Sequence, residues 1–190
     1  MYEIGVAGNS AGGKSTFCKL FGEKHLKSGI VTCDAIMTKS LYENTSKLIE
    51  AFDEEPMWTP EKKLDLRYMF ASPDRVSTCI AITKDDVQEG IYDAIKDLKK
   101  NKKSIALIDW AWLPTSDVWK TCDKRIIVDA DEETRFQRFR MRARGIGYSD
   151  DEIKKFLKAV SLPVENIECD MRINNMKSDS LNKAVEAFKL

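Results

Sequence analysis

The sequence has little of what several classes of protein need. Histidine occurs once, at His25, and the five cysteines include no Cys-x-x-Cys pair. Neither a structural zinc site nor a disulfide framework is therefore expected. The cysteines are odd in number and fall mostly in apolar or helical stretches, a pattern typical of reduced thiols in the cytosol. We interpret His25 as an exposed residue at the end of a helix.

The chain also lacks a long apolar run and an excess of either charge. No run approaches the roughly 18 apolar residues that span a bilayer, and the first residues lead into a strand-like segment without a charged-then-apolar leader. The 31 basic and 31 acidic residues cancel, so overall charge favours neither nucleic acid nor an anionic membrane as a partner. We expect a cytoplasmic protein with a local anion site and small-molecule substrates. The sequence does not indicate an oligomeric state.

The first segment that carries chemistry is Gly8-Asn9-Ser10-Ala11-Gly12-Gly13-Lys14-Ser15. It matches G-x-x-x-x-G-K-[S/T] at every fixed position, follows an apolar run and precedes a helix-like stretch, which is the context of a P-loop. Its backbone N–H groups are expected to form a nest for β- and γ-phosphates, which the missing side chains of Gly12 and Gly13 let reach the main chain. Lys14 is expected to reach the phosphate oxygens, and the Ser15 hydroxyl to bind Mg²⁺.

Two later strand-like segments end in an acid. Residues 28–33 are followed by Asp34, and residues 104–108 by Asp109, in the Walker-B arrangement whose carboxylate approaches Mg²⁺ directly or through water. Ligands bind at the carboxyl ends of the strands of an open parallel sheet. Asp34, in the strand expected next to the P-loop strand, should therefore lie beside the P-loop. The alternative is that Asp34 caps a helix beginning at Ala35.

Residues 35–100 are mostly helical in pattern, with a long amphipathic stretch over 85–100 and prolines at 56, 60 and 73. The block is too long for a simple crossover, so part of it is expected to form a lobe that grips the second substrate. The aromatic candidates for lining its pocket are Trp58, Tyr68 and Phe70, and core packing is their alternative. Trp110 and Trp112 are candidates for a wall of the acceptor site or for a cap on the core.

A helix rich in arginine follows a fourth strand-like segment at residues 125–128. Arg135, Arg138 and Arg142 share one helical face. Arginines gathered in an otherwise neutral protein suit a lid that clamps phosphate, and a solvated stripe is the alternative. The segment Gly145-Ile146-Gly147 is expected to act as a hinge, and residues 149–152 form a capping box that restarts a helix.

A fifth strand-like segment at residues 171–175 and a closing helix at 180–188 complete a βαβ series. The pattern predicts an α/β P-loop NTPase fold with a five-stranded, mostly parallel sheet and helices on both faces. We expect one domain over residues 1–190, with a helical acceptor-binding insertion at about 35–100 and a helical lid at 132–160.

Several segments, in order, resemble the dephospho-CoA kinase family. They are residues 4–16, 31–35, 67–70 with Pro73, 126–129 with Arg138 and Arg142, and 169–175. The resemblance implies ATP-dependent phosphorylation of the ribose 3′-hydroxyl of dephospho-CoA. It implies a catalytic role for Lys14, Asp34 as the base facing the acceptor hydroxyl, and Arg138 and Arg142 in the lid. The implied ATP-binding residues are Gly8, Ala11, Gly12, Gly13, Lys14, Ser15, Thr16 and, near the adenine, Asn175; Ser15 and Asp109 are the residues expected at the metal.

Three segments on the acceptor and lid side depart from the family pattern: residues 109–114, residues 83–85 and Val160. A (deoxy)nucleoside monophosphate kinase therefore stays open as an alternative enzyme. A GTPase switch is an alternative of another class, because Thr83-Lys84-Asp85-Asp86 looks like a T-K-x-D guanine-recognition motif. The switch also needs Asp-x-x-Gly, however, and no glycine occurs between Gly29 and Gly90.

Overall fold

The computed structural model describes residues 1–59, 61–69, 71–144, 146–177 and 179–188. Its centre is a sheet of β1 (Tyr2–Ala7), β2 (Ser28–Thr32), β3 (Ile105–Asp109), β4 (Lys124–Asp129) and β5 (Met171–Asn174). The strand order is β2-β3-β1-β4-β5, and each neighbouring pair is parallel. The predicted five-stranded α/β sheet is therefore confirmed.

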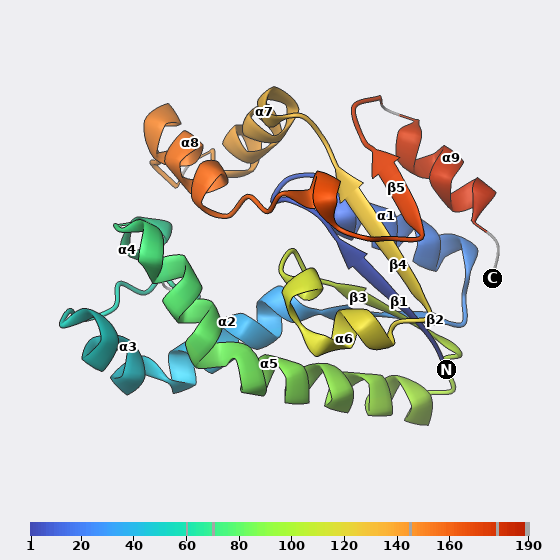
Figure 1. Cartoon of the computed structure of the whole chain (residues 1–190), viewed down its shortest axis with the longest axis horizontal. Helices are drawn as coiled ribbons and strands as arrows, with labels where there is room; N and C mark the ends of the chain where they lie inside the picture. The colour runs from blue at the N-terminus through green and yellow to red at the C-terminus, as the bar shows by residue number, and fades with distance from the viewer. Residues whose placement is uncertain (60, 70, 145, 178, 189–190) are drawn as a thin grey trace.

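Helices cover both faces of the sheet (Figure 1). In the described part of the chain they are α1 (Lys14–Lys24), α2 (Cys33–Glu43), α3 (Thr45–Phe52), α4 (Leu66–Met69), α5 (Pro73–Lys100), α6 (Asp117–Thr121), α7 (Glu132–Arg142), α8 (Asp150–Ala159) and α9 (Ser180–Ala187). Two short 3₁₀ turns, η1 (Leu113–Thr115) and η2 (Val164–Asn166), complete them. None of the described helices is long and apolar enough to cross a membrane.

Alternation along the strands divides the core between the two faces of the sheet. All five residues of β3 are buried, as expected for a parallel strand covered on both sides. Leu107 belongs to the cluster that contains Phe17 and Phe21 of α1, whereas Ile108 belongs to the cluster that contains Ile91 of α5. Successive side chains of a strand point to opposite faces, so one apolar run serves both helical layers.

Helices α7 and α8 have a small core of their own. Phe136 of α7 and Phe156 and Leu157 of α8 are buried together with Val76 near the start of α5. The predicted capping box is present, because the Ser149 side chain and Glu152 bond to each other's backbone N–H groups. Helix α7 and helix α8 therefore form one packed unit that rests against α5.

Three features of the fold differ from the sequence-based expectations. Strand β3 lies between β1 and β2, so Asp34 does not follow the strand next to β1. Helix α2 begins at Cys33, which puts Asp34 in its first turn and makes Thr32 the N-cap in place of Asp34. Helix α5 starts at Pro73, well before Asp85, because apolar residues of its first turns pack both with α7 and α8 and in the main core.

The structure also tests predictions made for single aromatic and histidine residues. Tyr68 is 2% exposed and belongs to the core, and Phe70 lies outside the described residues. His25 ends α1 as predicted, but it is half-buried rather than exposed, because its ring stacks on Phe21 with centroids 4.2 Å apart.

Candidate active site

The P-loop connects β1 to α1 and has a backbone that only glycine tolerates at two points. Gly8 and Gly13 have φ angles of +136° and +114°, in the region that disfavours other residues. A Cβ atom at Gly8 would lie 2.0 Å from the Val128 carbonyl oxygen, and one at Gly13 would lie 2.2 Å from Nδ2 of Asn175. The loop is thus packed tightly against β4 and the segment after β5.

Lys14, Ser15 and Asp109 lie together where the P-loop meets β3. The Ser15 hydroxyl donates to Oδ2 of Asp109 at 2.5 Å, and Lys14 Nζ donates to the Asn9 carbonyl oxygen at 3.1 Å. Burial lowers the pKa of the Lys14 ammonium, and the nearby carboxylates, led by Asp109, oppose that shift. Burial raises the pKa of Asp109, and the Ser15 hydrogen bond and the Lys14 charge oppose it. A buried carboxylate thus touches a hydroxyl beside a cation.

This oxygen pair fits a magnesium ion that arrives with a nucleotide. Among the residues that the structure describes, no group of three or more His, Cys, Asp or Glu side chains is placed to hold a metal. Mg²⁺ is usually bound by one or two protein oxygens together with substrate phosphates and water. The adjacent oxygens of Ser15 and Asp109 meet that requirement.

A large cavity opens at the carboxyl edge of the sheet, and we call it the main cavity. Its volume is about 1020 Å³, and its lining includes Lys14, Asp34 and Arg142. Trp58 and Trp112 form part of its apolar wall, whereas Trp110 is 3% exposed and belongs to the core. The P-loop, the first turn of α2 and the end of α7 therefore contribute one charged side chain each to a single space.

The arginine face of α7 divides between different partners. Arg142 lines the main cavity; burial lowers the pKa of its guanidinium, and the charge of Asp34 opposes the shift. Arg138 donates from Nη1 to the carbonyl oxygens of Ala11 and Gly12 at 3.5 and 3.4 Å, and from Nη2 to that of Asn175 at 2.7 Å. Arg138 thus ties α7 to the P-loop, while Arg142 lines the cavity beside it.

The third arginine of that face is structural. Arg135 is 7% exposed, donates to the Ser161 hydroxyl at 3.1 Å, and lies 4.0 Å from a carboxylate oxygen of Asp129. Arg140, on another side of the helix, pairs with Asp150 at 3.0 Å. The stripe is therefore neither a uniform clamp nor a uniformly solvated face.

Asn175 lies against the P-loop. Its Nδ2 donates to the Gly12 carbonyl oxygen at 2.8 Å, and its backbone N–H donates to the Asp129 carbonyl oxygen at 2.7 Å. It is 6% exposed. These contacts hold the loop in shape, and the expected proximity of Asn175 to the adenine stays a prediction.

Asn9 is a residue of this site that the sequence did not single out, because it occupies a variable position of the motif. Its Nδ2 donates to Oδ2 of Asp129 at 3.0 Å and to the Leu162 carbonyl oxygen at 3.3 Å, and its Oδ1 accepts from the Leu162 N–H at 2.7 Å. It is 5% exposed. Asn9 thereby connects the P-loop both to β4 and to the segment that follows α8.

The guanine-motif lookalike is not a binding loop. Thr83 is 1% exposed within α5, and its hydroxyl donates to the Cys79 carbonyl oxygen at 2.9 Å. Asp86 accepts from the Ser40 hydroxyl at 2.6 Å and from Asn44 at 2.9 Å, so it joins α5 to α2. The GTPase alternative therefore loses the motif on which it depended.

Comparisons by sequence and by fold gave matches to known proteins. A sequence model of the dephospho-CoA kinase family matches residues 2–180, and a search of curated proteins gave no match. Among solved structures, TT1252 from Thermus thermophilus has a TM-score of 0.67 at 20% identity, over 98% of this chain and 95% of that one. A shikimate kinase from Bacteroides thetaiotaomicron has a TM-score of 0.57 at 14% identity, and the match covers 97% of this chain and 94% of that one. A dephospho-CoA kinase from Campylobacter jejuni has a TM-score of 0.49 at 20% identity, and the match covers 97% of this chain and 95% of that one.

Proposed function

The chain belongs to the dephospho-CoA kinase family, an ATP-dependent phosphotransferase family that acts on dephospho-CoA, and we propose that it transfers the γ-phosphoryl group to the ribose 3′-hydroxyl within the main cavity. One observation carries this assignment: Lys14, Asp34 and Arg142, from three separate segments, line the same space. Phosphoryl transfer depends mainly on positioning and on charge stabilisation. A P-loop cation, a carboxylate and a lid cation around one cavity supply both.

In this proposal the P-loop holds the phosphates of ATP. The backbone from Gly8 to Thr16 surrounds the β- and γ-phosphates, and the Lys14 ammonium neutralises their charge. Ser15 and Asp109 would hold Mg²⁺, which when bound neutralises further charge on the phosphate oxygens. Asn9 and Asn175 act indirectly, since their hydrogen bonds keep the loop in its binding shape.

Asp34 is the proposed general base. It is exposed and lines the main cavity together with Lys14. Its carboxylate takes the proton of the acceptor hydroxyl as the oxygen bonds to the γ-phosphorus. The bond from that phosphorus to the bridging oxygen breaks at the same time, and ADP leaves with the electron pair.

Replacing Arg142 by Lys should lower kcat, and replacing Arg138 by Lys should lower activity as well. A positive charge supplied at the transferring phosphoryl group can contribute up to roughly 10³-fold in rate, and lysine keeps that charge but loses the planar fork. For Arg142, which lines the cavity, we expect the loss mainly in kcat. For Arg138, which bonds to three carbonyl oxygens, we expect it also in KM for ATP.

Steady-state kinetics at varied ATP concentration measures both variants, and Arg144→Lys, at an exposed position just beyond α7, is the control. Wild-type kinetics in both Arg138→Lys and Arg142→Lys would mean that neither guanidinium has a role in transfer.

The acceptor is tested by competition between substrates. We expect ATP-dependent product with dephospho-CoA, carrying its new phosphate on the ribose 3′-oxygen as read by ³¹P NMR. With AMP, dTMP or dCMP as acceptor, kcat/KM should be far lower. A higher kcat/KM for a nucleoside monophosphate would replace this proposal by the nucleotide kinase alternative, on the same scaffold.

A further inference from the structure

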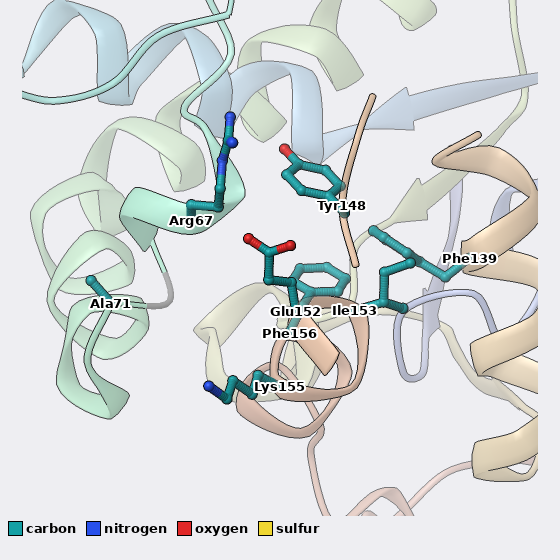
Figure 2. A pocket seen from close by; sticks show the side chains of 8 residues that line it. All are labelled: Arg67, Ala71, Phe139, Tyr148, Glu152, Ile153, Lys155 and Phe156. Carbon is teal, nitrogen blue, oxygen red and sulfur yellow. The ribbon is translucent and has the colours of Figure 1, made fainter. Parts of the chain in front are cut away.

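A second, smaller cavity lies between α4 and the lid, and we call it the side pocket. Its volume is about 240 Å³. Figure 2 shows Arg67 and Ala71 on one side of it and residues of α7, α8 and the loop between them on the other. Four residues line both this pocket and the main cavity: Arg67, Phe139, Tyr148 and Phe156. The side pocket is thus a lateral extension of the main cavity.

The size of the side pocket argues against an independent ligand. Pockets that hold a small molecule by themselves usually measure about 300–1,000 Å³, and the side pocket is smaller than that range. The main cavity is at its upper end. An extension of this size beside a large cavity fits one arm of a long ligand whose reactive end lies elsewhere.

The chemistry of the side pocket suits an uncharged arm. Phe139, Phe156 and Ile153 supply apolar wall, and the Glu152 carboxylate lies among the side chains in the middle of the view in Figure 2. Hydrogen bonds from the Ser149 backbone N–H and hydroxyl hold the pKa of Glu152 below its usual value, so this group is charged at neutral pH. The Lys155 ammonium, which also lines the pocket, balances that charge, and Arg67 is paired with Asp65. The lining therefore has no unbalanced positive charge to attract phosphate, and the carboxylate favours hydrogen-bond donors.

One oxygen of Glu152 remains for such a donor. Both hydrogen bonds from Ser149 go to Oε2, at 2.7 and 2.8 Å. An amide N–H or a hydroxyl group entering the pocket therefore meets an ionised acceptor at its centre and aromatic rings around it.

Charge is distributed differently in the main cavity. Its lining includes the cations Lys14, Lys63 and Arg142 and the acids Asp34 and Glu61, which leaves an excess of positive charge. Arg67 lies at the junction, where its Nε and Nη2 atoms donate to the two carboxylate oxygens of Asp65 at 3.1 and 2.9 Å. That bidentate pair fixes the orientation of the guanidinium. Phosphate groups are thus expected on the main-cavity side of Arg67.

We propose that the side pocket binds the pantetheine arm of dephospho-CoA, with the diphosphate at the junction and the ribose beside Asp34. This inference depends on the proposed function. The arm is uncharged, long and flexible, and it carries two amide groups, a hydroxyl and a pair of methyl groups. Its N–H and O–H groups match the Glu152 carboxylate, and its methyl and methylene groups match Phe139 and Phe156.

Filling the side pocket tests the proposal. Ala71 is exposed and lines the side pocket but not the main cavity, so Ala71→Trp should occupy the space without disturbing the core. If the tryptophan prevents about two methylene groups of the ligand from being buried, the affinity should fall roughly tenfold. We therefore expect the Kd of dephospho-CoA, measured by calorimetry, to rise at least about tenfold. The Kd of AMP, which lacks the arm, should be unchanged.

Asp74→Trp is the matched control. It places the same side chain at an exposed position three residues further along the chain, which lines neither cavity, and it should leave both Kd values unchanged. If Ala71→Trp weakens AMP as much as dephospho-CoA, or weakens neither, the side pocket does not bind the arm.

A charge reversal distinguishes the arm from the diphosphate. Lys155 lines the side pocket, and Lys158, on the same helix, does not. With an uncharged arm in the pocket, Lys155→Glu should change the Kd of dephospho-CoA no more than Lys158→Glu does. A selective loss in Lys155→Glu, relieved by high salt, would mean that the diphosphate lies there and would overturn the proposal.

Wild-type turnover separates this inference from the function on which it depends. If the wild-type protein does not phosphorylate dephospho-CoA, both fail. If wild-type turnover is normal and Ala71→Trp binds dephospho-CoA like the wild-type protein, only the assignment of the side pocket fails.

Discussion

Replacing Lys14 by Ala should abolish phosphoryl transfer and leave the fold intact. The charges of Asp109, Asp34 and Asp129 act on the Lys14 ammonium, which lines the cavity where transfer is proposed. Removing one group that stabilises transition-state charge typically costs about 10²–10³-fold in kcat. The hydrogen bond from Lys14 to the Asn9 carbonyl oxygen is worth too little for its loss to unfold the chain. Steady-state kinetics and the melting temperature measure the two effects separately.

Lys19→Ala is the control for this variant, because Lys19 is an exposed residue of the same helix, α1, that does not line the main cavity. It should have wild-type kcat. Retention of more than about a tenth of wild-type kcat in Lys14→Ala, against the loss expected for such a group, would place phosphoryl transfer outside the P-loop.

Asp34→Asn should lower kcat by about 10²–10⁴-fold, the usual contribution of a positioned general base, and should barely change KM for ATP. Asparagine keeps the size of the side chain and removes its ability to take the proton of the acceptor hydroxyl. Asp34 is in the first turn of α2 but is not its N-cap, so the substitution removes no capping hydrogen bond. Loss of the negative charge near the helix N-terminus costs only about 0.3–1 kcal/mol of stability.

The small effect on stability has its own control. Asp74→Asn makes the same change in the first turn of α5, at an exposed position that does not line the main cavity. Both variants should melt slightly below the wild-type protein, and only Asp34→Asn should lose activity. A fully active Asp34→Asn enzyme would remove Asp34 from the chemistry and leave it as a residue of a helix end.

The sequence was most informative where the determinants are local. The P-loop, the five strands and the capping box at Ser149 are each encoded within a few neighbouring residues. Glycine positions, short apolar runs and a Ser-x-x-Glu spacing act through the backbone conformation of the segment itself. For the same reason, motif and spacing alone predict Lys14, Ser15 and Asp109 at a phosphate and metal site, and Ser15 and Asp109 do meet in the folded chain.

Boundaries and strand order depended on contacts that local patterns do not contain. The insertion of β3 between β1 and β2 separates Asp34 from the P-loop strand in the sheet, yet Asp34 still reaches the main cavity because α2 begins directly after β2. The early start of α5 and the short helix α6 were not predicted. Both depend on burial against distant elements: Val76 of α5 packs with α7 and α8, and Val118 of α6 packs in the main core.

The sequence by itself thus determined the fold class, the phosphate-binding loop and the residue types available for catalysis. Only the tertiary structure decided which partner each of those residues contacts. Of two arginines on the same face of α7, Arg138 bonds to the P-loop and Arg142 lines the cavity. Asn9 bonds to Asp129, which is 120 residues away in the sequence. The reason is physical: helical periodicity specifies which side chains share a face, but the partner of each is set by whichever distant segment packs against it.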